Sequence, residues 1–157
     1  MAFKRTLLIA GLLCSLAFGA NLSTVKNVYL LPMPGGMDHY LAVQLTKAGF
    51  VQVVTDPSHA DAVITDHIGA SLEDSMNELF LPKKEKDPKD KDSEPAHARM
   101  QPLSRGKGSI FVVDRGSRVV LWSTFAPTPS GGSAQVNKLA IKVTAEMQKA
   151  WAGTPAK

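Results

Sequence analysis

Residues 25–55 read VKNVYLLPMPGGMDHYLAVQLTKAGFVQVVT and predict a strand, a helix and a second strand. Val25 to Leu31 is rich in β-branched and aliphatic side chains, which favours a strand. The segment that follows the Pro-Gly-Gly turn has apolar side chains at helical spacing, and Gly49 is a typical helix stop. Those apolar positions are Met37, Leu41, Leu45 and Ala48. Phe50 to Thr55 predicts the second strand, which we expect to lie parallel to the first through a right-handed crossover.

The next forty residues continue this pattern of strand and helix. Asp56-Pro57 is a helix cap followed by proline at the first helical position, and it predicts about one turn through Ala60. Ala62 to Ile68 predicts a third strand. Ser71, with Asp74 three residues later, resembles a capping box and predicts a short helix to Phe80. Its buried side would carry Leu72, Met76, Leu79 and Phe80.

The C-terminal part predicts a hairpin and a long helix. Ile110 to Val113 and Arg118 to Phe125 read as strands around Asp114-Arg115-Gly116-Ser117, where Asp and Gly suit the backbone angles of a tight loop. Ser133 is a candidate N-cap for a final helix that ends near Gly153 and Pro155. One face of this helix would be apolar, at Val136, Leu139, Ala140, Val143, Met147 and Trp151.

These elements predict an α/β fold of the two-layer sandwich kind, with an α+β-like order of elements. The expected order is β-α-β-β-(short α)-loop-β-β-α, with about five strands in a mixed sheet and two main helices. We expect residues 21–157 to form one small domain, because their number suits a single modest core.

The first twenty residues predict export. Lys4 and Arg5 precede an apolar run from Thr6 to Phe18, and small residues follow, which is typical of a secretory signal peptide over residues 1–20. The run is shorter than the roughly 20 residues that a membrane span needs, so the mature form would have no transmembrane anchor. Cys14 is the single cysteine, and the bulky Leu13 before it argues against a lipid anchor. We therefore expect a periplasmic or secreted protein without disulfides.

The charge pattern excludes one class of partner and marks one unusual segment. The net charge is +4, and without Lys4 and Arg5 the chain has 16 basic against 14 acidic side chains, which is too balanced for nucleic-acid binding. Residues 82–107 mix charges with prolines and predict a disordered surface loop. The loop is either a plain solvated linker or a recognition loop whose contacts would be Lys83, Lys84 and Lys86.

The pattern of elements resembles a group of small α/β domains from bacterial envelope proteins. An Ala60-Asp61 step enters the third strand, and the hairpin from Asp114 leads through Ser117 to Leu121-Trp122-Ser123 before the last helix. Such features are similar to those of the N-terminal domain of TolB, of the curli secretion protein CsgG and of the outer-membrane activators of penicillin-binding proteins. The resemblance implies the fold and an envelope location, and it implies structural roles for Asp56, Pro57, Asp61, Asp114 and Gly116.

Catalytic patterns are weak throughout the sequence. His59 and His67 lie near aspartates, but Asp66 and His67 would point to opposite faces of a strand, so only one of them could join His59. A metal site needs three or four converging ligands, and no serine lies in a G-x-S-x-G elbow. The Pro-Gly-Gly turn lacks the lysine of a phosphate-binding loop. We therefore expect no cofactor, no metal and no catalytic residue.

The function that we predict is recognition of a partner protein. Along the second hairpin strand, Val120 and Trp122 would share one face, and Leu121 would lie on the other. Trp122 and Trp151 are candidates either for core packing or for partner contact. We expect a non-catalytic binding or accessory module of the bacterial envelope, which pairs a sheet edge with an envelope protein. The alternative is an exported hydrolase or metal-dependent enzyme that uses His59 or His67 with a nearby Asp or Ser.

Overall fold

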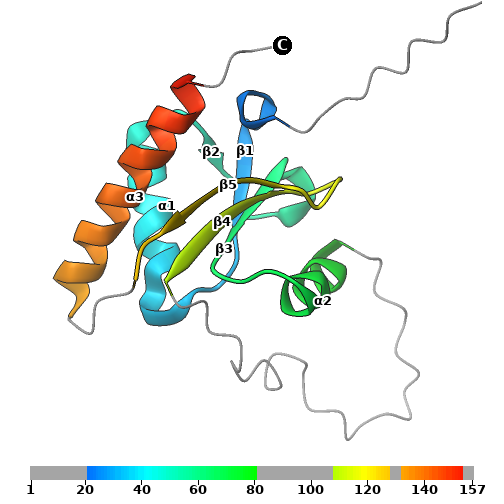
Figure 1. Ribbon diagram of the computed structural model, residues 1–157, viewed down its shortest axis with the longest axis horizontal. Coiled ribbons are helices and arrows are strands. Elements are labelled where there is room, and N and C mark those ends of the chain that lie inside the picture. The colour runs from blue at the N-terminus through cyan, green and yellow to red at the C-terminus, as the bar shows by residue number, and fades with distance from the viewer. Residues whose placement is uncertain (1–20, 81–107, 128–131, 154–157) are drawn as a thin grey trace, which may run out of the picture.

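A computed structural model describes residues 21–80, 108–127 and 132–153 and confirms the α/β fold (Figure 1). The predicted signal peptide and the whole of the predicted charged loop, residues 82–107, lie outside these ranges. The strands are β1 (Asn27–Leu30), β2 (Gln52–Val53), β3 (Ala62–Thr65), β4 (Ser109–Asp114) and β5 (Val120–Phe125). The α-helices are α1 (Met37–Ala48), α2 (Ala70–Phe80) and α3 (Ser133–Gly153).

The five strands form one mixed sheet in the order β2-β1-β3-β4-β5. β1 pairs in parallel with both β2 and β3, and β4 pairs antiparallel with β3 and β5. The parallel pairing of β1 and β2 around α1 confirms the strand–helix–strand unit that the sequence predicted. Gly49 ends α1 with a φ of 70°, and its N–H donates to the Leu45 carbonyl at 3.0 Å, because glycine tolerates this left-handed cap.

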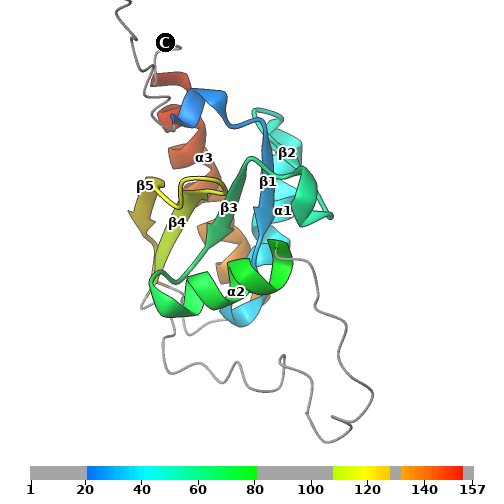
Figure 2. The ribbon, with the colours of Figure 1, turned by 90° about the vertical axis from the view of Figure 1, so that its right-hand side faces the viewer.

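Helices cover both faces of the sheet, and together they bury two apolar clusters. α1 and α3 lie side by side on one face, over a large cluster that includes Leu41, Ile64 and Met147. α2 crosses the lower part of the opposite face (Figure 2), where Met76 packs in a smaller cluster with Val63. The expected two layers are therefore supplemented by a partial third layer. Within the described ranges, no helix is both long and apolar enough to cross a bilayer.

The last helix is joined to the start of the described chain. The Trp151 indole Nε1–H donates to the Val25 carbonyl at 3.3 Å, and its ring meets Phe50 edge-to-face with centroids 5.4 Å apart. Leu22 and Val25 are buried close to this helix end. Trp151 thus helps to close the core while it remains half-buried.

Three local details differ from the sequence predictions. α2 begins at Ala70, so Ser71 lies inside the helix and does not cap it. Gly132, and not Ser133, accepts the first backbone bond of α3, from the Gln135 N–H at 2.9 Å. In the hairpin loop Arg118 is the residue with a left-handed φ, of 61°, whereas Gly116 has no such angle.

A β-bulge in β5 makes the predicted arrangement of its two faces wrong. Val112 pairs with Trp122 and Val113 pairs with Val120, so Leu121 is an additional residue in the ladder. Leu121 and Trp122 consequently both pack against the large cluster, and Val120 lies on the opposite face from Trp122. The strict alternation that the sequence suggested is therefore wrong at this point.

Gly108 allows the ends of β4 and β5 to approach each other closely. Its φ is +89°, and a Cβ built on it would overlap the backbone of Pro127. The Ala126 N–H donates to the Gly108 carbonyl at 2.5 Å and extends the pairing of the two strands beyond their ends. Only glycine combines this backbone angle with this contact.

Candidate functional site

The aspartates singled out from the sequence bind backbone groups at one end of the sheet. Asp61 Oδ2 accepts hydrogen bonds from the backbone N–H groups of Lys26 at 3.0 Å and of Asn27 at 2.8 Å. Asp114 Oδ2 accepts from the Ser117 N–H at 2.6 Å and from its hydroxyl at 2.8 Å. Both carboxylates are therefore occupied in fixing the start of β1 and the hairpin loop, where Gly116 is exposed.

Asp56 and Pro57 have a comparable local role. Pro57 begins a short 3-10 turn over Pro57–His59, and Asp56 caps that turn through the Ser58 N–H at 2.8 Å. The Ser58 hydroxyl also donates to Asp56 at 2.6 Å. These hydrogen bonds, that of the hydroxyl above all, hold the pKa of Asp56 below its ordinary value, because they stabilise the ionised carboxylate.

The two histidines of the enzyme alternative lie at opposite ends of β3. His59 precedes the strand, is largely exposed and has its Nδ1 3.4 Å from Asp56 Oδ2. His67 follows the strand, whose four residues span about 13 Å. The structure therefore does not bring His59 and His67 into one site.

Asp66 and His67 contact each other, which corrects the prediction that they face apart. β3 ends at Thr65, so strand alternation no longer applies to the next two residues. Asp66 Oδ1 lies 2.8 Å from His67 Nδ1, and the Thr65 hydroxyl lies 3.1 Å from the same nitrogen. A nucleophile–base–acid triad needs the hydroxyl and the carboxylate on different ring nitrogens. Thr65, Asp66 and His67 do not provide that arrangement.

The surroundings of this pair offer little room for a substrate. His67 Nε2 is buried and has no hydrogen-bond partner among the described residues. The cavity beside Asp66, between Met33 and Ile110, has a volume of about 10 Å³, which suits a single water. Pockets for small molecules usually measure about 300–1,000 Å³. In the described part of the chain, no three His, Cys, Asp or Glu side chains gather closely enough to hold a metal ion.

A larger hollow lies over β2 at the opposite side of the sheet. It encloses about 680 Å³, is widely open to solvent and lies between Lys26, Thr46 and Phe50. No histidine, carboxylate, cysteine or serine lines it. Lys26 and Thr46 are its potentially reactive side chains, and neither has a histidine or carboxylate beside it in the lining that could act as a general base.

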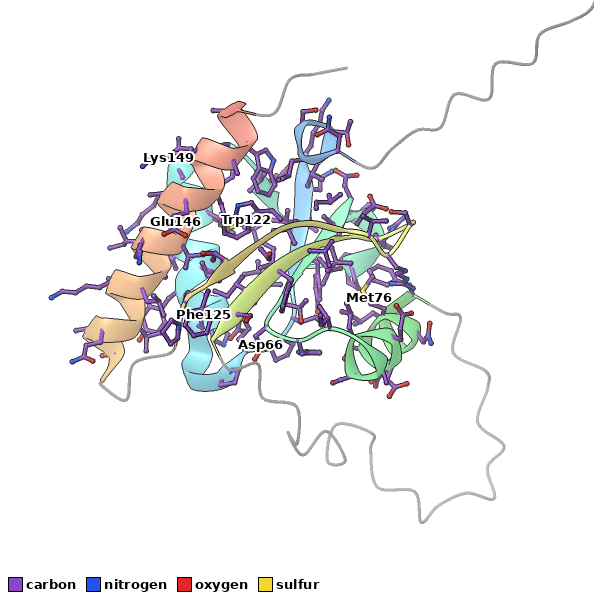
Figure 3. All side chains as sticks on the ribbon, viewed as in Figure 1. Asp66, Met76, Trp122, Phe125, Glu146 and Lys149 are labelled. Carbon is purple, nitrogen blue, oxygen red and sulfur yellow. The ribbon has the colours of Figure 1, made fainter. Side chains whose placement is uncertain are left out.

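The outer strand β5 has backbone hydrogen-bonding groups on one side that no described strand pairs with. β5 pairs with β4 on one side, and no described strand lies on its other side. Since Ala126 is hydrogen-bonded to β4, the backbone groups of Thr124 and Trp122 also face β4, and those of Ser123 and Phe125 face outward. Phe125 is moreover 68% exposed, at the end of the strand (Figure 3).

Side chains of β5 alternate between two different environments. Thr124 lies on the face of α3, where its hydroxyl donates to Glu146 Oε2 at 2.8 Å. Ser123 and Phe125 lie on the opposite face, because they pair with Phe111 and Ser109, and both are exposed. Phe125 was missed by the sequence reasoning. The sequence carried no clear signal for it, because strict alternation places Phe125 on the same face as Val119 and Leu121, both of which are apolar.

The remaining predicted contact residues divide into two groups. Trp122 and Trp151 are half-buried and pack against the large cluster, so each presents only part of its ring to solvent. Lys83, Lys84 and Lys86 lie outside the described residues.

Comparison with known proteins gave no match: no family model, no curated protein and no solved structure is significantly similar to this chain. The resemblance to envelope domains noted from the sequence therefore remains a prediction.

Proposed function

We propose that this protein is a non-catalytic binding module of the bacterial cell envelope, exported by its signal peptide. It would bind an extended segment of another envelope protein along the free edge of β5. The observation that carries this proposal is the outward-facing backbone of Ser123 and Phe125 on an outer strand, beside an exposed aromatic ring. Partner proteins commonly add a strand to such an edge through main-chain hydrogen bonds.

The edge lacks the usual features that prevent strand addition along its central part. Residues 120–125 read VLWSTF, without a charged residue or a proline. Natural proteins usually protect an edge with such residues, or they cover it. Protection appears only at the two ends, as the bulge at Leu121 and as Pro127, which has no N–H to offer. The accessible edge is therefore short and has a defined position.

Site-specific photo-cross-linking in the host cell tests this proposal. A photoreactive residue would replace Ser123 or Phe125 on the edge, and in the control it would replace Val43, which is 51% exposed on α1. We expect one envelope protein to cross-link from both edge positions and not from the control position. Mass spectrometry should place the cross-links on an extended segment of that protein.

Two substitutions make the test specific for strand pairing. Ser123→Pro removes an outward N–H without removing a hydrogen bond to β4, and Phe125→Lys places a charge at the exposed ring. Ser123→Pro should abolish the cross-link from position 125, and Phe125→Lys should abolish the cross-link from position 123. Val43→Lys should leave both cross-links intact. Cross-linking that survives Ser123→Pro and Phe125→Lys would refute the β5 edge as the contact.

A further inference from the structure

The segment that β5 would accept can be described further from the residues on either side of this edge. One side is formed by α3, where Lys142, Glu146 and Lys149 recur at intervals of four and three residues and share one face. Glu146 is held against β5 by its bond with Thr124 (Figure 3). The two lysines therefore project from the turns before and after the point where α3 meets β5.

The charge of this stripe is positive. Both oxygens of Glu146 have partners: Oε2 accepts from Thr124 at 2.8 Å, and Oε1 lies 3.9 Å from Lys142 Nζ. Lys142 remains 70% exposed, and Lys149 is exposed. A further lysine, Lys138, lies one turn before Lys142 on the same helix, and Glu146 is its only acidic residue. The excess positive charge favours acidic groups beside it.

The other side of the edge is apolar. Phe125 and Val120 lie on the face away from α3 and are 68% and 43% exposed. Ser123, which lies between them on this face, is uncharged. A contacting segment would bury part of this apolar surface with apolar side chains of its own.

A strand added to β5 would lie about 4.8 Å beyond it and would direct successive side chains to these two sides in turn. We propose that the β5 edge selects an extended segment in which acidic and apolar residues alternate; this inference rests on the proposed function. The acidic residues face Lys142 and Lys149, and the apolar residues face Phe125. The bulge at Leu121 and Pro127 restrict regular pairing to about five residues of the segment.

Peptide titrations of the full chain test this selectivity. The probes are capped peptides that alternate Glu with Val or Lys with Val. Each has about nine residues, a length that extends past both ends of the accessible edge. Backbone amide chemical shifts report binding at Ser123 and Phe125. We expect the Glu–Val peptide to bind at least about tenfold more tightly than the Lys–Val peptide, and added salt to reduce this difference.

Charge reversal supplies the decisive control. Lys142→Glu with Lys149→Glu should invert the preference, whereas Lys26→Glu with Lys47→Glu, on lysines near β2 and the end of α1, should leave it unchanged. Equal binding of both peptides, or a preference that survives the reversal on α3, would overturn the inference.

The remaining outcomes separate this inference from the proposed function. If residue 123 cross-links to a partner but the charge reversal has no effect on that cross-link, β5 is the contact and the acidic–apolar selectivity is wrong. Sedimentation that shows a dimer, lost on Phe125→Lys, would identify a second copy of this chain as the occupant and would overturn the inference.

Discussion

Replacing Gly108 with alanine tests the close approach between β4 and the end of β5. A non-glycine residue at a left-handed φ costs about 1–2 kcal/mol, and Gly108 has a φ of +89°. The new Cβ would also overlap the backbone of Pro127, and overpacking of this kind typically costs about 1–3 kcal/mol. Because the overlapping atoms belong to a backbone and cannot rotate away, we expect a total destabilisation of about 3 kcal/mol or more.

Two other glycines separate the contributions of backbone angle and contact. Gly49 has a φ of +70° and no atom within 4 Å of an added Cβ, so Gly49→Ala should cost about 1–2 kcal/mol, from the backbone angle alone. Gly153 has neither a left-handed φ nor a neighbour within 4 Å, so Gly153→Ala should change the stability by less than about 0.5 kcal/mol. The series thus isolates the contribution of Pro127.

Urea unfolding, followed by circular dichroism and tryptophan fluorescence, gives the free energy of unfolding of each variant by linear extrapolation. Equal destabilisation by Gly108→Ala and Gly49→Ala would show that the approach of Pro127 contributes nothing. A stable Gly108→Ala protein would refute the geometry of this strand end altogether.

The remaining predictions concern the core, Asp61 at the start of β1, and the capping residue Asp56. Met147→Ala should cost about 2–5 kcal/mol in urea unfolding because Met147 is fully buried, whereas Ile141→Ala, at an exposed position of the same helix, should cost less than about 1 kcal/mol. Asp61→Ala should lower the stability by about 1–2 kcal/mol, since two backbone N–H groups lose their acceptor; an unchanged midpoint would contradict this role. The hydrogen bonds from Ser58 lower the pKa of Asp56 in the folded protein. The contribution of Asp56 to stability is therefore fully present above pH 3.8 and is lost as the pH falls through the lowered pKa. The difference in melting temperature between wild type and Asp56→Asn should therefore shrink on acidification. A difference that stays constant with pH would contradict a stabilising role for the ionised carboxylate.

Elements with strong local patterns were predictable from the sequence. The apolar spacing of α1 and the glycine after it predicted the first helix well, and the β1–α1–β2 unit followed from it. Asp56-Pro57 predicted the turn before β3 because capping depends on a few adjacent residues. These features are determined by neighbours in the chain.

Features that depend on pairing between distant segments were not predictable in the same way. The bulge that turns Leu121 and Trp122 to one face arises from the register of β5 on β4. The contact between Asp66 and His67 depends on where β3 ends, and that end is set by its pairing with β4. The exposure of Phe125 followed only once β5 was known to be an outer strand.

The bond between Trp151 and Val25 joins residues that lie far apart in the chain. Because the large cluster also needs Met147, the core cannot close until α3 has been synthesised. Contacts between such distant segments slow folding, since a long loop must close before they form. For a protein that is exported by a signal peptide, as we propose here, late closure would leave the chain unfolded, and able to cross the membrane, for as long as its C-terminal helix is missing.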